Sequence, residues 1–423
     1  MPVYLLFLLL IPFQDHRILG AQLFHAGSFP MTPIKLVGIP LVAAALLLPR
    51  PRDASPRPSA AILLLFAAFG LFQIVGTALS SLSFPSVDAS FLFSTVILIF
   101  ATNNLVSTRR RLQLVIRAIV LVETFGSTWL YKQYYIYHWA RPGGPSGDPN
   151  YEALSLVVVV PLAIWLVRYE QRGLWKWAGR ICTPILVFGV FVSQSRGGVL
   201  ALTVMAVLAW VDSRHKIRLM VGVAVAGLLM LVIGPSKTYE RIQQIQIKGQ
   251  AETGAEISTR CRFELLRAGI HMMEAHPVFG VGLGQYKSAE YHYNPVLNLI
   301  EPAPQIAHNT YVQLGAEGGI PALALYLTIL GVTLAACRTT QKLPGVPKDL
   351  AVLARSFQIG VIGIMVAQIF LTADYVKEVS VLIALAPNLY AISLQTAAVS
   401  VKTTSSQPEP AKPRVLRPRL RNG

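Results

Sequence analysis

Long apolar runs separated by short basic loops make up most of the 423-residue chain. The runs are roughly 16 to 25 residues long, close to the length that a helix needs to cross a hydrocarbon core. A segment inside a bilayer must satisfy its own backbone hydrogen bonds, so runs of this length indicate helices and not barrel strands. The pattern therefore predicts an all-α integral membrane protein.

Twelve membrane spans are predicted from this pattern, which places both termini on the same side. The apolar run at residues 1–13 has no basic flank and no small-residue cleavage site, so we expect an uncleaved span there. The expected spans are at about 2–13, 31–49, 59–83, 88–105, 112–131, 151–168, 177–194, 197–212, 217–233, 319–337, 354–372 and 377–397.

Four regions follow from these spans. Residues 1–233 hold the first nine spans, and residues 234–318 form a long loop that contains the candidate chemistry. Residues 319–397 hold the last three spans. Residues 398–423 are polar, basic and rich in proline, which predicts a disordered tail that contacts membrane lipid.

The charge pattern orients the predicted bundle. Only 13% of residues are charged, and the formal net charge is +17. The basic residues gather in alternate loops, which the positive-inside rule places in the cytoplasm together with both termini. This distribution explains the charge without a nucleic-acid partner, and it locates the loop 234–318 outside the cytoplasm. The three cysteines lie far apart in the sequence and indicate neither a disulfide framework nor a metal site.

The main polar passage of the chain is residues 258–321. Apolar residues recur at helical spacing from about 259 to 275, which predicts an amphipathic helix whose apolar face is Phe263, Leu266, Ile270 and Met273. Such a helix can lie on a membrane surface. Arg262 is close to the apolar edge and is expected to point inward. The glycines from Gly280 to Gly284 lack the strand that a dinucleotide loop requires, so they predict turns.

Two further arginines stand on the same predicted side of the membrane. Arg196 lies in Ser193–Gly198 between two spans, where an unpaired cation is costly, and this favours an anion site over simple snorkelling. Arg141 follows several aromatic residues in 132–151. That segment is either an interfacial aromatic belt or a rim that contacts a sugar or a headgroup, with Arg141 facing phosphate.

A histidine beside several arginines suits transfer from a phosphorylated donor. Imidazole can take the proton of an attacking hydroxyl, and guanidinium groups can bind a leaving diphosphate without a metal. His308 is the candidate base, although a purely structural histidine is an alternative. Glu317 lies on the opposite helix face from His308, so it is expected to pair with an arginine or a helix terminus. His271 and His276 do not share a face, so no zinc site or other cofactor is predicted.

Three motifs resemble those of the O-antigen ligase and polymerase superfamily of bacterial membrane glycosyltransferases. They are Ser195–Gly198, an arginine before a helix that leads to 276–284, and His308-Asn309-Thr310-Tyr311 followed by Glu317-Gly318-Gly319. Their order and spacing cover roughly residues 150 to 340, while the first spans match by topology alone.

The resemblance implies a twelve-span, metal-independent enzyme of the C-type glycosyltransferase fold in the bacterial inner membrane, with its active site facing the periplasm. It implies an undecaprenyl-diphosphate-linked glycan donor and a lipid A core or glycan acceptor. Its motifs make His308 the base and Arg196 with Arg262 or Arg260 the diphosphate clamp. The family commonly has a tryptophan where this chain has Leu266, and this departure leaves the choice of arginine open. Five further residues have possible supporting roles: Arg141, Asn150, Asn309, Tyr311 and Glu317.

Ligation of O-antigen to lipid A core is the leading hypothesis, and polymerisation of repeat units is the alternative within the family. A polytopic transporter of a glycan or lipid-linked substrate is the alternative from another class. Transporters place polar groups at mid-membrane in two related halves. Here Glu123 is the only evident acid within a span, and it is expected to pair with Arg117 or a tyrosine.

Overall fold

The protein is almost entirely helical. In the computed structural model the chain is described over residues 1–13, 24–26, 29–80, 90–213, 215–217, 220–222, 254–300, 303–373 and 376–405. The exception to helix is a short antiparallel hairpin of β1 (Phe24–Ala26) and β2 (Phe29–Met31), in which Phe24 pairs with Met31. The predicted all-α class is confirmed.

Helices coincide with eleven of the twelve predicted spans, and most of the span at 217–233 lies outside the described residues. The helices of the first two thirds are α1 (Pro2–Leu10), α2 (Pro33–Leu47), α3 (Ala61–Leu79), α4 (Ser90–Leu105), α5 (Arg109–Tyr135), α6 (Pro149–Tyr169), α7 (Gly173–Val192) and α8 (Arg196–Asp212). The later ones are α11 (Gly254–Ala275), α12 (Tyr286–Tyr293), α13 (Leu297–Ile300), α14 (Thr310–Lys342), α15 (Lys348–Ala367) and α16 (Lys377–Ser405).

Seven of the described helices are long and apolar enough to cross a membrane: α3, α5, α6, α7, α14, α15 and α16. The apolar helices α2 and α4 are shorter, and α1 and α8 also fall below that length. The chain is therefore a multi-pass membrane protein, and the crossing of the membrane by all twelve predicted spans stays a prediction.

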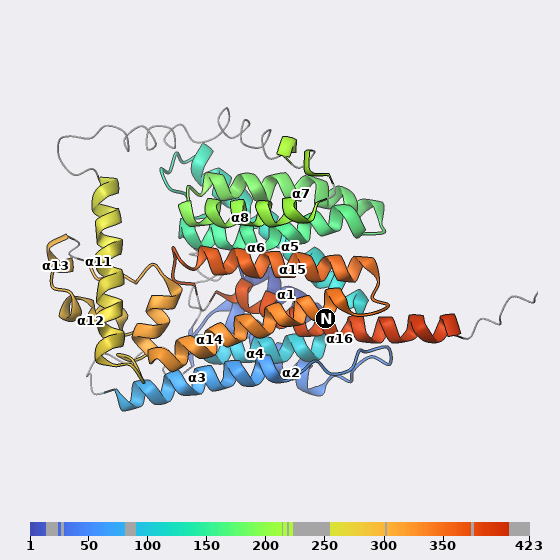
Figure 1. The fold of residues 1–423 in the computed structure, drawn as a ribbon, viewed down its shortest axis with the longest axis horizontal. Coiled ribbons are helices and arrows are strands. Elements are labelled where there is room, and N and C mark those ends of the chain that lie inside the picture. The colour runs from blue at the N-terminus through green and yellow to red at the C-terminus, as the bar shows by residue number, and fades with distance from the viewer. Residues whose placement is uncertain are drawn as a thin grey trace, which may run out of the picture.

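The long helices lie side by side with roughly parallel axes, as Figure 1 shows. Helix α15 packs between α6, α8 and α14, and α14 in turn packs against α3. Helix α6 is buried along most of its length, which explains its run of valines on all faces. Trp165 at its far end is buried and donates a hydrogen bond to the carbonyl of Asp349 at 2.8 Å, which ties α6 to α15.

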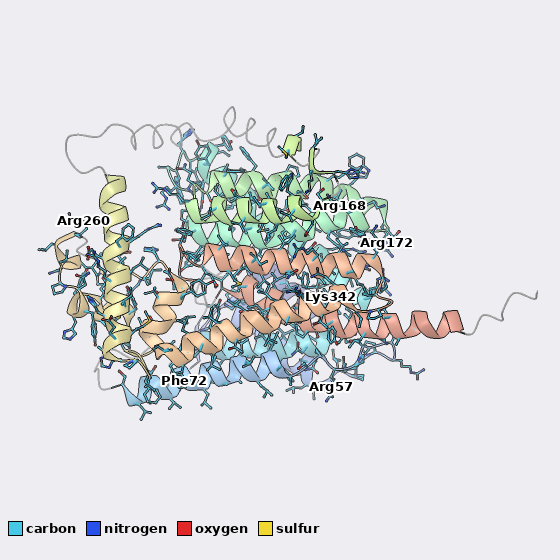
Figure 2. All side chains as sticks on the ribbon, in the orientation of Figure 1. Arg57, Phe72, Arg168, Arg172, Arg260 and Lys342 are labelled. Carbon is cyan, nitrogen blue, oxygen red and sulfur yellow. The ribbon has the colours of Figure 1, made fainter. Side chains whose placement is uncertain are left out.

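Helix α11 crosses one end of this bundle, nearly at right angles to the long helices, with α12 and α13 beside it (Figure 1). A separate apolar cluster joins α11, α12 and α13 to the first turns of α14. Arg260 on α11 and the pair Arg168 and Arg172 stand at opposite ends of the bundle (Figure 2). The polar segment 258–321 thus builds a small helical cap on one end of the bundle.

One predicted boundary agrees with the structure and one does not. The tenth span was expected to start at residue 319, and α14 consists of two helical parts that meet at Gly319, where φ is 73°. The tail was expected to be disordered from 398, but α16 continues to Ser405, because neither glycine nor proline interrupts the chain before Pro408. Residues 406–423 lie outside the described part.

Candidate functional site

His308 lies directly before Asn309, the residue that caps α14, at the capped end of the bundle. Its backbone is left-handed, with φ of 50°. Asn309 is the N-cap of α14, since its side-chain oxygen accepts a hydrogen bond from the amide of Val312 at 3.0 Å. The Asn309 side chain also donates to the carbonyl of Ile369 at 3.1 Å, and the amide of Thr310 donates to Gln368 at 2.9 Å. His308 is therefore fixed between α14 and the segment that joins α15 to α16.

Arg262 and Arg260 differ in where α11 places them. Arg262 is half-buried, whereas Arg260 is exposed. The apolar face predicted for this helix does not pack on the cap: Phe263 is 62% exposed and Ile270 is 44% exposed. The face that packs on the cap consists of Cys261, Leu265, Ala268 and Met272. The helix carries two apolar stripes, and the stripe of smaller side chains allows the close approach to α14.

Arg196 is the first residue of α8, directly after the turn that ends α7. Ser195 is the N-cap of α8, and its hydroxyl also donates to the side-chain oxygen of Asn150 at 2.9 Å. Asn150 lies in the first turn of α6, whose N-cap is Asp148. The hydrogen bond between Ser195 and Asn150 therefore joins the start of α8, which carries Arg196, to the start of α6.

Arg141 lies in the loop that leads from α5 to α6, and its side chain is exposed. The loop is held by Gln133 of α5, whose amide exchanges two hydrogen bonds with the backbone of Gly144, at 2.8 and 3.0 Å. Both groups of Gly144 and the side chain of Gln133 are buried, so this contact fixes the path of the loop.

The charges of these groups act on one another. Burial lowers the pKa of the Arg262 guanidinium, and the positive charges of Arg141 and Arg196 lower it further, while the Asp148 carboxylate opposes them. Charges influence a pKa this way only at short range. Three chain segments that are distant in sequence, the α5–α6 loop, the α7–α8 turn and α11, therefore bring their arginines together.

The same groups act on His308. Burial is the largest cause that lowers the pKa of His308 from 6.5 to about 4, and the charge of Arg262 is the next. Arg141 and Lys287 lower the pKa further, and Asp148 opposes them. At neutral pH the imidazole is therefore uncharged and able to accept a proton.

Backbone strain gathers at the same place. Among the described residues, the non-glycine residues with positive φ are His138, Gln194 and His308, at 54°, 56° and 50°. His138 comes three positions before Arg141, and Gln194 two positions before Arg196. Left-handed backbone costs a residue with a Cβ about 1 kcal/mol or more, and it persists where the surrounding structure holds it. These three turns are therefore held in place by the fold around the site.

Glu317 supports the cap. Its buried carboxylate accepts hydrogen bonds from the amides of Gly284 and Tyr286, at 2.9 and 3.3 Å, and from the side chain of Gln313 at 3.0 Å. Tyr286 begins α12, so Glu317 pairs with a helix terminus, one of the two alternatives that the sequence left open. The turns predicted at Gly280–Gly284 are also present, with positive φ at Gly280, Gly282 and Gly284.

Tyr311 also has an anchoring contact. Its hydroxyl donates to the carbonyl of Met365 on α15 at 2.8 Å, so it ties the first turn of α14 to the bundle.

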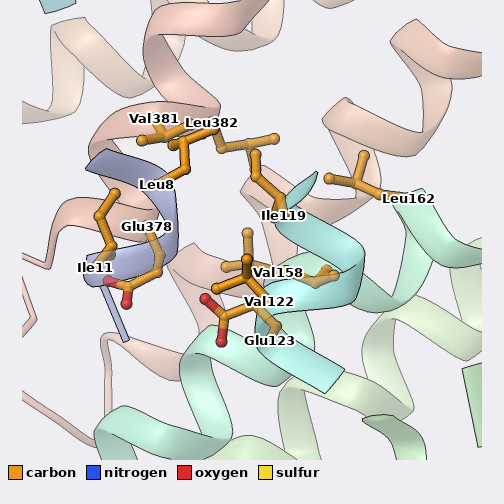
Figure 3. Close-up of a pocket in the computed structure, with 11 residues that line it drawn as sticks. Leu8, Ile11, Ile119, Val122, Glu123, Val158, Leu162, Glu378, Val381 and Leu382 are labelled. Atoms are coloured by element: carbon orange, nitrogen blue, oxygen red, sulfur yellow. The ribbon is translucent and has the colours of Figure 1, made fainter. Parts of the chain in front are cut away.

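The acid that the sequence placed within a span occupies another part of the bundle. Glu123 of α5 faces an apolar cavity opposite Glu378 of α16, as Figure 3 shows. Arg117, one of its two predicted partners, is paired elsewhere: the Nη2 of Arg117 lies 2.5 Å from the Oε2 of Glu170. Glu170 is the C-cap of α6, and its Oε2 accepts hydrogen bonds from both the Nε and the Nη2 of Arg117. The lining of the cavity is otherwise aliphatic: Leu8, Ile11, Ile119, Val122, Val158, Val159, Leu162, Val381 and Leu382.

Two charged groups that act on His308, Lys287 and Asp148, were given no definite role from the sequence. Lys287 lies on α12 and is exposed, and nothing in its sequence context distinguishes it from other surface lysines. Asp148 is recognisable as an N-cap before a proline, but not as the carboxylate that acts on both Arg262 and His308. In the described part of the chain no three His, Cys, Asp or Glu side chains form a cluster that could hold a metal ion.

This arrangement supplies an uncharged imidazole beside a cluster of fixed cations. Such a cluster can bind a diphosphate and stabilise the charge that develops as it leaves, while the imidazole accepts a proton from a nucleophile.

One comparison with known proteins bears on this site. The family model described as O-Antigen ligase matches residues 181–327, which include Arg196, Arg262 and His308. The chain matches none of the curated proteins. The matched range begins within α7 and ends within α14, so it contains the whole cap and leaves Arg141 and Asp148 outside.

Proposed function

Because this match supports placing the chain in the O-antigen ligase and polymerase superfamily, we propose that it transfers a glycan from undecaprenyl diphosphate to a hydroxyl of lipid A core. The observation that carries the proposal is the uncharged imidazole of His308 among cations from three separate segments. It matches the two needs of the reaction, a base for the acceptor and a clamp for an anionic leaving group.

In the proposed reaction His308 takes the proton from the acceptor hydroxyl as its oxygen attacks the anomeric carbon of the donor. The bond between that carbon and the diphosphate oxygen breaks, and the configuration inverts. Undecaprenyl diphosphate leaves with the bonding electrons, and the proton remains on the imidazole until it is released. No metal is required, since Arg196 and Arg262 balance the charge of the diphosphate.

Arg262 is favoured over Arg260 as the second arginine of the clamp. Arg262 is half-buried and its charge acts on His308, whereas Arg260 is exposed and its charge acts on Glu264, a neighbour on its own helix. Arg141 and Lys287 are further cations of the site, while Asn150, Asn309, Tyr311 and Glu317 position its parts.

We assign the protein to the bacterial inner membrane, with the cap in the periplasm and both termini in the cytoplasm. The placement of Arg168 and Arg172 at the end opposite Arg260 supports this orientation, because cytoplasmic loops are enriched in basic residues (Figure 2).

The decisive experiment is reconstitution of the purified chain with undecaprenyl-diphosphate glycan and separate acceptors: lipid A core, a second lipid-linked glycan, and a protein. Transfer to lipid A core is expected. His308→Ala should reduce turnover at least about 100-fold and leave donor binding intact, because general-base catalysis contributes that much. Arg196→Ala should weaken donor binding.

His271→Ala is the matched control, since His271 is an exposed histidine of α11 whose Nδ1 lies 3.1 Å from the carbonyl oxygen of Tyr293. Wild-type turnover in His308→Ala would refute the catalytic role. Transfer only to the second lipid-linked glycan would identify a polymerase, and glycan flux without bond formation would identify a transporter.

A further inference from the structure

Two exposed aromatic rings stand at the outer end of α5. Tyr137 is 47% exposed and Trp139 is 49% exposed. Their ring centroids are 6.4 Å apart, with 41° between the ring planes. Together they present two broad apolar faces that nothing in the described chain covers completely.

The backbone holds both rings in fixed positions. The amide of Tyr137 donates to the carbonyl of Lys132 at 3.1 Å, and the amide of Trp139 donates to the carbonyl of Gln133 at 3.0 Å. Gln133 is also the residue whose side chain clamps Gly144, so both ends of this loop are tied to the last turn of α5. The Lys132 ammonium lies 5.3 Å from the centroid of the Tyr137 ring and fixes that ring further.

His138, between the two rings, has a left-handed backbone with φ of 54°. An L residue adopts this conformation at a cost, and such strain is retained mainly at functional sites. The strained residue turns the chain so that both neighbouring rings remain exposed. Rings that are already ordered lose little entropy when they bind a ligand.

The loop continues directly into the cationic site. Arg141 comes two positions after Trp139, and its charge acts on both Arg262 and His308. A ligand whose anionic part lies among these arginines therefore has its adjoining part close to the two rings. A ligand that suits both the arginines and the two rings is one in which a diphosphate is joined to a flat, partly apolar group.

We propose that Tyr137 and Trp139 form a sugar-binding platform for the glycan of the diphosphate-linked donor. A sugar ring has an apolar face of C–H groups and a rim of hydroxyls, which match an aromatic face with a polar tip. Because Arg141 is on the same loop, the sugars nearest the diphosphate meet the platform. The inference rests on the proposed function and adds to it the recognition of the donor sugar.

The platform is tested with two lipids that differ only in their sugars. Binding of undecaprenyl-diphosphate glycan and of sugar-free undecaprenyl diphosphate is measured for the full-length protein in nanodiscs. Trp139→Ala and Tyr137→Ala should each weaken binding of the glycan lipid about threefold to tenfold and leave the sugar-free lipid unchanged. Trp139→Leu, which keeps an apolar side chain, should behave like the alanine variant and covers the case in which alanine unfolds the loop.

Trp177→Ala is the matched control. Trp177 is 61% exposed near the start of α7, at the other end of the bundle, and its ring lies 4.7 Å from the Arg180 guanidinium carbon. It should leave both affinities unchanged. Equal losses for the two lipids, or unchanged affinities in the Tyr137 and Trp139 variants, would each overturn the platform. Failure of the wild-type protein to bind either lipid would instead overturn the proposed function.

Discussion

Replacement of Arg262 by glutamine should raise the pKa of His308. Burial and the charge of Arg262 are the two largest causes that lower this pKa from 6.5 to about 4. A shift of that size corresponds to roughly 3 kcal/mol in favour of the uncharged imidazole. One partly screened unit charge at short range contributes about 1 kcal/mol, so Arg262→Gln should raise the pKa by just under one unit.

The assay is a pH titration of histidine side chains by NMR in detergent-solubilised protein, with the His308 signal identified by its loss in His308→Gln. Arg267→Gln is the matched control, because Arg267 lies on the same helix but is exposed and paired with Glu264 at 2.9 Å. It should leave the His308 titration unchanged. A pKa for His308 that is unchanged or lower in Arg262→Gln would refute the electrostatic argument.

The same shift has a consequence for stability and for catalysis. An unfolded His308 takes up a proton near pH 6.5, but the folded one does so only near pH 4, so this residue destabilises the fold increasingly as pH falls through that window. In the free enzyme the acid limb of kcat/KM should therefore lie near pH 4. A bound diphosphate offsets the arginine charges, so the acid limb of kcat should lie at higher pH.

Two further predictions concern the cap. Glu317→Leu removes the acceptor of three hydrogen bonds and should lower the free energy of unfolding by about 3 kcal/mol or more, seen as an earlier thermal transition in detergent; an unchanged transition would contradict this role. Gly319→Ala should lower the free energy of unfolding by about 2 kcal/mol or more, because φ is 73° and a Cβ would lie 2.3 Å from the carbonyl oxygen of Val278. Gly331→Ala is the control: its Cβ would meet nothing within 4 Å, so its effect on stability should be neutral or slightly stabilising. Equal effects of the two glycine substitutions would show that the bend at Gly319 is not constrained.

The helices could be predicted because the hydrophobic pattern itself determines them. A membrane span must be apolar over its whole length, so its position is visible in the sequence whatever it packs against. The packing face of α11 could not be predicted in the same way. This helix has apolar residues at two sets of helical spacings, and only the partner surface on α12 and α14 decides that Leu265 is buried and Phe263 exposed.

Residues of the candidate site that belong to a sequence motif could be predicted. Residues that reach it only through tertiary contacts could not. His308 and Arg262 belong to motifs, and the structure places them close enough to interact. Lys287 and Asp148 join them from segments that the motifs do not include. The preference that we propose for Arg262 over Arg260 also rests on the structure, because residues two apart on a helix face different directions.

The strain at His138, Gln194 and His308 had no signal in the sequence, since glycine is the usual residue for a left-handed turn. Each of these turns directs a neighbouring group: the two rings near His138, the arginine after Gln194, and the imidazole of His308 itself. A glycine would adopt the same backbone at less cost but would leave it free to move. In the proposed reaction the imidazole of His308 is required, and hydrogen bonds from the residues next to His138, Gln194 and His308 hold these turns. The donor proposed for this site is a flexible lipid-linked molecule, which loses conformational entropy when it binds. Rigid protein groups lose little entropy of their own, so the entropy lost by the ligand is then the main ordering cost that opposes binding.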